Sequence, residues 1–352
     1  MQSKPDRLTS TDISDELIPG LPNDVSATCL ALVGRSGLRD LAIVSRRWRS
    51  FLVGGDLQAV RESLGLVEEL LHVLVSTGNR KQWNILDSSG RIVGILPPMP
   101  GPNKSGFGVA VLGDKILVAG GFSVIANRIF TASSDVFQFD PCLNSWSKLP
   151  EMNEARYSFA FAAVNGKVYA VGGYGRDGYA LSTAEVYDPR ANRWTFFQGI
   201  QRPRYSAFAF SFNNSLHVMG GRSTTTVGSA DCVEVYDPDT DTWRVFSGPW
   251  RSAMVTGCVA VGNRVFCLDW KDPKEIRVFG LENCSWESIR IPGGSNCVGH
   301  VLGSMDGKLL LFPMEPGADT LRYDPSVGSG SGWDTCGIRP PGSCSASVTT
   351  KA

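Results

Sequence analysis

The residues best suited to chemistry are three histidines, His72, His217 and His300, and a glycine-rich stretch from Gly173 to Gly178. That stretch reads GYGRDG and fits the G-x-G-x-x-G fingerprint of a dinucleotide site. Such a site needs a helix directly after the glycines, because the N–H groups of its first turn hold the phosphates. The residues that follow, ALSTAEVYD, predict a strand instead. We therefore expect no dinucleotide site.

The histidines also lack the spacing of a metal site. Each lies within or beside a predicted strand, and the chain has no H-E-x-x-H pair. Nine cysteines, scattered from Cys29 to Cys344, contain no C-x-x-C pair and predict neither zinc ligands nor a disulfide framework. No nucleophile elbow or P-loop is present. The sequence predicts no catalytic residue, no metal and no cofactor.

Composition places the chain among ordinary globular proteins. Its 352 residues are 42% apolar and 19% charged, and 34 basic residues balance 34 acidic ones. A balanced charge gives no net attraction to nucleic acid or to an anionic membrane, so we expect neither as a partner. The first thirty residues lack a secretory signature, and no apolar run approaches the roughly 18 residues of a membrane span. We expect an intracellular protein of the cytoplasm, the nucleus or both.

The elements that must position any binding residue are visible as a repeat of about 48 residues. Each unit reads as an apolar strand, Gly-Gly, a polar loop, an alternating strand, an Asp-Pro turn and a tryptophan. The repeated tryptophans are Trp146, Trp194, Trp243, Trp286 and Trp333. About four short strands per unit, with turn signals between them, predict an all-β propeller. The glycines would permit close backbone approach, and each tryptophan would wedge against the next blade.

These units resemble the kelch family. The resemblance rests on the Gly-Gly pairs at 120/121, 172/173 and 220/221, and on the spaced tryptophans. It also rests on the aromatic-Asp-Pro steps that begin at Phe139, Tyr187 and Tyr236. The last two units are weaker matches, with CLDWK and LFPME where Gly-Gly should fall.

The C-terminal tail is predicted to complete the first blade. Eleven residues past the repeated tryptophans, an innermost strand begins, and the same count from Trp333 reaches Cys344. Residues 70–96 supply only three strands, with Asp87 at the aspartate position and Val93 at the tryptophan position. We therefore predict a six-bladed propeller over residues 67–352, with its first blade closed by the C-terminal strand. A disordered tail is the alternative, because the tail is poor in large β-forming residues.

Residues 15–66 have a helical texture, preceded by a flexible segment over residues 1–14. One predicted helix carries Leu38, Leu41, Val44, Trp48 and Phe51, with Ser36 as its N-cap and Gly54-Gly55 as its stop. An earlier helix carries Val25, Cys29, Leu30 and Val33, and a third begins near Asp56. Three short helices are marginal alone, so some apolar surface should await a partner.

This all-α module resembles an F-box, which docks substrate receptors onto the Skp adaptor of SCF ubiquitin ligases. The matching residues are Leu21-Pro22, Asp24-Val25, Cys29-Leu30 and VSRRWRSFL from Val44 to Leu52. The resemblance implies docking onto the adaptor, and through it to cullin, by Leu21, Pro22, Leu30, Leu38, Leu41 and Trp48. The alternative makes these residues a private core or a seam against the propeller.

The kelch resemblance also implies a substrate-binding face. Residues at the matching loop positions are Phe122, Arg156, Tyr174, Arg204 and Arg222. Arginine forks pair with carboxylates and aromatic rings give rigid contact area, so this composition suits protein recognition. The alternative reading is that these are solvated loop arginines.

The combined prediction is a non-catalytic substrate-recognition subunit of an SCF ubiquitin ligase that binds an unknown target protein. One alternative is a kelch scaffold that assembles proteins without degradation. A remote alternative is a copper-dependent enzyme like galactose oxidase. That reading conflicts with the three histidines of this chain and with the absence of a secretory signature.

Overall fold

The computed structural model describes residues 16–78, 80–125, 129–224, 232–247, 255–269, 274–283, 285–292, 300–327 and 332–351. The predicted segment 1–14 lies outside this described part. The chain divides into two compact units that meet between Val67 and Glu68.

The described residues of the first unit, from 16 onward, form four helices. They are α1 (Asn23–Ala31), α2 (Arg35–Val44), α3 (Arg46–Val53) and α4 (Asp56–Ser63). The single helix predicted from Ser36 to Phe51 is therefore wrong. Ser45 has an extended backbone (φ −151°, ψ 157°), and its Oγ accepts from the backbone N–H of Trp48 at 3.1 Å. A serine in this conformation is a strong N-cap, so it begins a new helix inside the apolar periodicity. Gly34, not Ser36, precedes α2.

A buried arginine fastens the end of α1. The Arg61 side chain extends from α4 and donates to the carbonyls of Ala31 at 3.1 Å and Val33 at 2.6 Å. These carbonyls lie at and just beyond the last turn of α1, where helical partners are missing. The two helices are thus joined by polar as well as apolar contacts.

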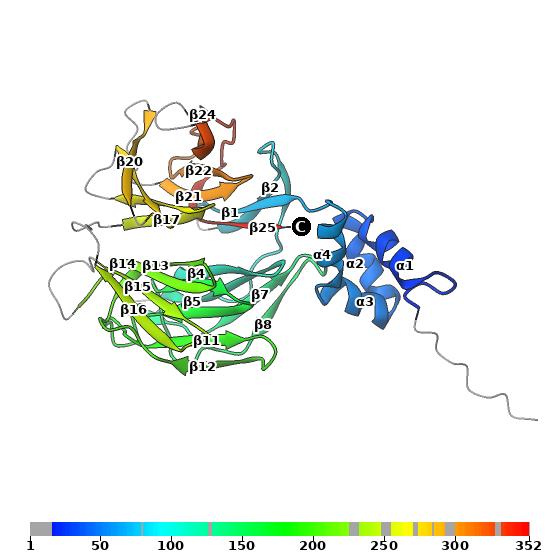
Figure 1. Cartoon of the computed structure of the whole chain (residues 1–352), viewed down its shortest axis with the longest axis horizontal. Coiled ribbons are helices and arrows are strands. Elements are labelled where there is room, and N and C mark those ends of the chain that lie inside the picture. The colour runs from blue at the N-terminus through cyan, green and yellow to red at the C-terminus, as the bar shows by residue number, and fades with distance from the viewer. Residues whose placement is uncertain are drawn as a thin grey trace, which may run out of the picture. The chain divides into compact units, whose positions relative to one another are not determined.

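The second unit is a β-propeller whose described strands form six sheets (Figure 1). Blade 1 contains β25 (Ser343–Lys351), β1 (Glu69–Thr77), β2 (Arg80–Leu86) and β3 (Ile92–Ile95). Blade 2 contains β4 (Ser105–Leu112), β5 (Lys115–Ile125), β7 (Val136–Asp140) and β8 (Ser145–Leu149), with β6 (Ile129–Ala132) paired to β5. Blade 3 contains β9 (Ala160–Val164), β10 (Lys167–Val171), β11 (Ala184–Asp188) and β12 (Arg193–Phe197).

The remaining blades follow the same order from inner to outer strand. Blade 4 contains β13 (Tyr205–Phe212), β14 (Ser215–Arg222), β15 (Cys232–Asp237) and β16 (Thr242–Ser247). Blade 5 contains β17 (Val255–Val261), β18 (Arg264–Asp269), β19 (Glu275–Gly280) and β20 (Trp286–Arg290). Blade 6 contains β21 (His300–Met305), β22 (Lys308–Pro313), β23 (Leu321–Tyr323) and β24 (Trp333–Thr335).

The predicted closure by the C-terminal strand is confirmed. Strand β25 pairs antiparallel with β1, and both lie together in Figure 1. The innermost strands touch in a closed cycle, β25 to β4, β9, β13, β17, β21 and back to β25. Ser347 Oγ also donates to the Leu302 carbonyl of blade 6 at 2.5 Å. The tail is therefore the inner strand of blade 1.

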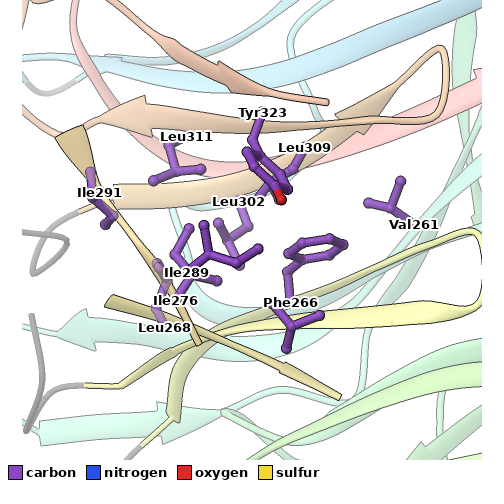
Figure 2. Packing of buried hydrophobic residues seen from close by; sticks show 11 residues of the cluster. Val261, Phe266, Leu268, Ile276, Ile289, Ile291, Leu302, Leu309, Leu311 and Tyr323 are labelled. Carbon is purple, nitrogen blue, oxygen red and sulfur yellow. The ribbon is translucent and has the colours of Figure 1, made fainter. Parts of the chain in front are cut away.

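The seams between blades hold the hydrophobic core. Figure 2 shows the seam between blades 5 and 6, where Phe266 of β18 and Tyr323 of β23 face each other with ring centroids 6.2 Å apart. Both are fully buried, and burial of such a side chain contributes about 1.5–3 kcal/mol. Summed over six seams, this burial is what holds the ring together.

Three tryptophans bond to the preceding blade, whereas the sequence predicted contact with the next one. The indole N–H groups of Trp146, Trp194 and Trp243 donate to the carbonyls of Pro97, Pro150 and Gln198, at 2.8, 3.0 and 2.7 Å. These carbonyls lie in the loop that leaves the preceding blade. Each indole therefore fastens its blade to the one before it, because that loop crosses the seam beside the outermost strand.

Candidate functional site

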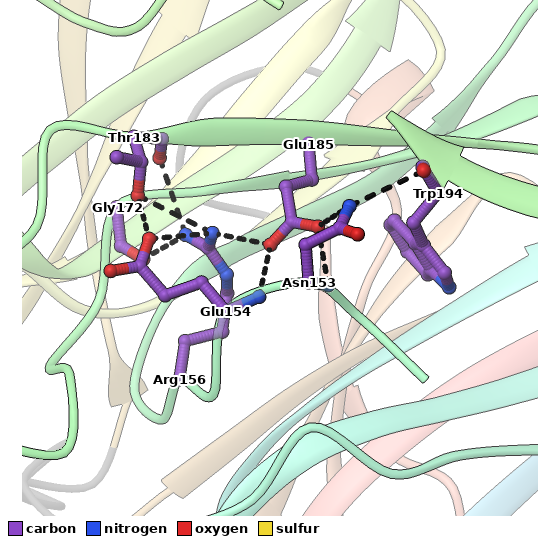
Figure 3. Close-up of polar contacts among 7 residues, drawn as sticks. All are labelled: Asn153, Glu154, Arg156, Gly172, Thr183, Glu185 and Trp194. Carbon is purple, nitrogen blue, oxygen red and sulfur yellow. Dashed lines mark hydrogen bonds and ion pairs between the residues drawn. The ribbon is translucent and has the colours of Figure 1, made fainter. Parts of the chain in front are cut away.

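The arginines predicted for the binding face are not on an open face. Arg156 and its partner Glu185 are each 0% exposed, and Arg156 Nη2 lies 2.8 Å from Glu185 Oε1. Figure 3 shows the guanidinium enclosed by Glu185, Glu154 and the carbonyls of Gly172 and Thr183. Arg204 is 1% exposed and pairs in the same way with Glu234. Both predictions are wrong, because the arginines satisfy buried carboxylates inside the fold.

A pair of a buried cation and a carboxylate recurs in three consecutive blades. In blade 2, Lys104 Nζ lies 2.5 Å from Asp135 Oδ2, at the place that Arg156 and Arg204 take in blades 3 and 4. The acid follows the cation by 31, 29 and 30 residues in the three blades. This spacing is visible once the repeats are aligned, and it is the signal that sequence reasoning missed.

The pairs support the Gly-Gly turns of the neighbouring blade. Gly173 N–H donates to the Arg204 carbonyl at 2.8 Å, and Gly121 N–H donates to the Arg156 carbonyl at 3.0 Å. Gly173 has a φ of +97°, and a Cβ there would lie 2.6 Å from Phe159 Cβ. Only glycine fits such an approach. The glycines and arginines together lock one blade to the next.

Four aromatic rings form a strip across blades 2 to 4, which we call the aromatic strip: Phe122, Tyr157, Tyr174 and Tyr205. Successive ring centroids are 4.9, 5.0 and 4.0 Å apart, and the last two contacts are stacked. Burial raises the pKa of Tyr174 above its usual value, and a hydrogen bond with Tyr205 adds to the rise. Tyr174 is therefore neutral, and the rings of the strip offer flat apolar faces with hydroxyl edges. Sequence reasoning found Phe122 and Tyr174 but not Tyr157 and Tyr205.

A cavity of about 610 Å³ opens beside the strip, among β4, β9, β13 and β17. Tyr205 and the exposed Arg222 line it, and Arg222 is the only charged residue among the described residues that do. Ser158 and Ser206, also in its wall, have φ values of +50° and +53°. Such backbone is uncommon for serine and is found at binding sites. The cavity suits a flat or acidic group.

The predicted docking residues of the helical unit divide into two sets. Leu21 and Pro22 are exposed, Leu41 and Trp48 are half-buried, and the Trp48 indole donates to the Leu17 carbonyl at 2.6 Å.

Leu30 and Leu38, by contrast, are each only 3% exposed. They form the interior of the unit, so in this conformation they are not on a surface that a partner can contact.

Other apolar residues of the unit are more exposed than those predicted. Ile43 is 77% exposed, and the set also includes Val25, Leu32 and Val44. Sequence reasoning placed Val44 in the apolar period of one long helix, but α2 ends there and the backbone is extended at Ser45. Together with Leu21 and Pro22 we call these residues the apolar surface of the helical unit.

The remaining chemical candidates are dispersed. His72 lies in β1, His217 in β14 and His300 in β21, each in a different blade. The glycines after Gly173 lead through a turn and a loop to β11, not to a helix. Within the described residues, no group of three or more His, Cys, Asp or Glu side chains is placed to hold a metal ion. No helix in the described part is long and apolar enough to span a membrane.

Comparison with known proteins identifies the family. The Kelch motif matches residues 104–153, 155–198 and 203–249, which contain blades 2 to 4. The F-box/kelch-repeat protein At1g67480 of Arabidopsis thaliana is 44% identical over 356 residues, covering 98% of this chain and 93% of that protein. A second Arabidopsis thaliana protein named for F-box and kelch repeats, At1g27420, is 41% identical over 344 residues, covering 95% and 97%.

A solved structure titled "Structure of YjhT" shares the propeller fold, with a TM-score of 0.54 at 14% identity over 68% of this chain and 85% of that one. The helical unit, the kelch propeller and the sequence similarity over nearly the full length lead to one conclusion: this chain belongs to the F-box/kelch-repeat proteins.

Proposed function

We propose that this protein is a non-catalytic substrate receptor of an SCF ubiquitin ligase. In this proposal the helical unit docks onto a Skp adaptor, and through it onto cullin, while the propeller binds a target protein. The observation that carries the proposal is the apolar surface of the helical unit, in a chain of the F-box/kelch-repeat family.

The apolar surface suits a stable protein interface. Exposed apolar side chains concentrated in one small unit are typical of interaction sites in soluble proteins. Burial of Ile43 in an interface would contribute the most binding free energy, because this side chain is 77% exposed and full burial of an isoleucine contributes about 1.5–3 kcal/mol. Leu30 and Leu38 support this surface from beneath and do not contact the adaptor.

The propeller offers the aromatic strip and the neighbouring cavity to the target. Stacked tyrosines provide rigid contact area at low entropic cost, and Arg222 favours an acidic group on the target. Holding the target beside a ubiquitin-charged enzyme raises the effective concentration of its lysines, so the receptor needs no catalytic residue.

Direct binding to a purified Skp adaptor tests the proposal. We expect calorimetry to show binding by the full chain, and Ile43→Asp to weaken it at least about tenfold, which is about 1.4 kcal/mol. The matched control is Ile95→Asp, which changes an isoleucine of β3 that is 54% exposed and should leave binding unchanged. The double change Leu21→Ala with Pro22→Ala should also weaken binding.

Two results would contradict the proposal. In the first, the wild-type chain does not bind the adaptor. That result would favour a scaffold without a role in degradation. Alternatively, Ile43→Asp and Ile95→Asp would bind equally well, which would move the docking surface elsewhere.

A further inference from the structure

The seam between blades 6 and 1 lacks the aromatic pair found in the other blades. In blade 3, Tyr187 lies opposite Trp194 with ring centroids 5.4 Å apart, and Phe139 with Trp146 repeats this in blade 2. In blade 1 the register instead places Ile92 opposite Leu86. Val93, predicted at the tryptophan position, is therefore wrong by one residue. The pairing of β2 with β3 shifts by one residue between Ile85 and Leu86, so Val93 is skipped and Ile92 faces Leu86.

A pocket of about 240 Å³ lies at this seam, which we call the seam pocket. Its walls include Val73, Leu86, Phe312 and Ile338, all buried, and Ile92. Two short aliphatic side chains here take the place of a tyrosine or phenylalanine and a tryptophan. The pocket therefore corresponds to the volume that the aromatic pair fills elsewhere in the ring.

A bound indole would also need a hydrogen-bond acceptor for its N–H at this position. In blades 2 to 4 the indole N–H donates to a carbonyl in the loop that leaves the preceding blade. For blade 1 that loop is residues 336–341, and Gly337 follows Trp333 by four residues, as Pro150 follows Trp146. Gly337 lines the pocket. By this count, its carbonyl corresponds to the carbonyls that accept the indole N–H in blades 2 to 4.

The pocket has access to solvent and room for one fused ring. Ile92 is 52% exposed and the Arg339 side chain is 66% exposed, so these lining residues mark the opening. An engineered apolar cavity of about 150 Å³ binds benzene, so the larger seam pocket accommodates a bicyclic ring. The cationic Arg339 beside the opening would add a favourable contact with an aromatic face.

From this geometry we propose that the seam pocket is a binding site for a small planar aromatic molecule with one ring N–H, of which indole is the simplest. The bound ring takes the place of the missing tryptophan and joins blade 6 to blade 1. This inference does not depend on binding to a Skp adaptor or to a target protein.

Thermal denaturation of the full chain with indole tests the proposal. A ligand that binds only the folded state raises Tm, by about 2–4 °C at roughly ten times its Kd. N-methylindole, which lacks the N–H, should bind more weakly. Ile92→Trp should raise Tm without ligand and weaken indole binding at least about tenfold, because the protein then supplies its own ring. Ile95→Trp, on the same strand but outside the pocket walls, should change neither property.

The proposal is overturned if indole gives no saturable rise in Tm, or if Ile92→Trp binds indole as tightly as the wild-type chain. If Ile92→Trp does not fold, methyl NMR of the wild-type chain decides the question. Chemical-shift changes at Leu86, Ile92 and Ile338 would support the site, and changes confined to other methyl groups would overturn it.

Discussion

Replacing Arg156 with methionine should destabilise the propeller without touching its exposed surface. The guanidinium donates to the carbonyls of Gly172 and Thr183 and to the carboxylate of Glu185, at 2.8, 3.2 and 2.8 Å. At about 1 kcal/mol for each bond to a carbonyl and about 1.5–3 kcal/mol for the bond to the carboxylate, the loss is about 4 kcal/mol. This agrees with the about 3–5 kcal/mol expected when one partner of a buried ion pair is removed.

The structure also places the expected loss of stability at the lower end of that range. Arg156 Nε is buried and has no hydrogen-bond partner among the described residues, and methionine removes that cost. We therefore expect the free energy of unfolding to fall by about 3 kcal/mol and Tm to fall by about 4–6 °C. Thermal and urea denaturation followed by circular dichroism measure both quantities.

A second substitution separates the ion pair from simple loss of packing. Glu185 also accepts from the backbone N–H groups of Asn153 and Glu154, at 2.7 and 3.0 Å. Adding Glu185→Gln to Arg156→Met removes the stranded charge but keeps an acceptor, so the double variant should recover about 1–2 kcal/mol. The control is Arg176→Met, at an exposed loop arginine, which should leave Tm unchanged. The reasoning is refuted if Arg156→Met costs less than about 1 kcal/mol, or if the two losses simply add.

Further predictions concern the ring closure, the glycine turns, the target surface and pH. Deletion of residues 343–352 should lower Tm by more than about 10 °C or prevent folding, and an unchanged Tm would show that β25 is dispensable. Gly173→Ala should cost more than about 3 kcal/mol in urea denaturation, because its Cβ would meet Phe159, whereas Gly178→Ala, with open space around it, should cost about 1 kcal/mol. Tyr174→Ala should abolish capture of target proteins in proximity labelling under proteasome inhibition while adaptor binding persists; equal capture would exclude the aromatic strip. Burial lowers the pKa of His217, so the unfolded chain binds more protons than the folded one, and stability should fall as pH drops below about 6.5. His217→Phe should flatten that part of a curve of Tm against pH. An unaltered slope would contradict this prediction.

Much of the propeller was predictable because repeats obey a fixed spacing. Counting eleven residues from each tryptophan placed the start of β25 to within one residue, and the starts of the other inner strands to within three, although the composition of the tail argued against a strand. The count worked because strand and loop lengths are conserved between units, whereas composition reports only average behaviour. A different count, of six residues from the aspartate to the tryptophan position, misplaced Val93, because the register between β2 and β3 shifts by one residue between Ile85 and Leu86.

The side-chain environment was less predictable. An arginine in a loop before a strand looks exposed until its carboxylate, about 30 residues away, is known to lie beside it. In the helical unit, Val44 follows the apolar period of α2, but the extended backbone of Ser45 ends that helix and leaves the valine exposed. Sequence patterns therefore predicted the helices and strands well. They did not predict which distant residues lie beside a given side chain.

The pairing of β25 with β1 also fixes an order of events when the protein folds. His72 and Thr350, which bond across these strands, are 278 residues apart in the chain. Bringing such distant segments together costs about 3 kcal/mol more chain entropy than closing a ten-residue hairpin. Blades 2 to 6, each built from consecutive strands, can assemble while the first waits as a three-stranded sheet. That waiting state exposes the unpaired edge of β1, and we expect it to be the slow, aggregation-prone intermediate on which chaperones act.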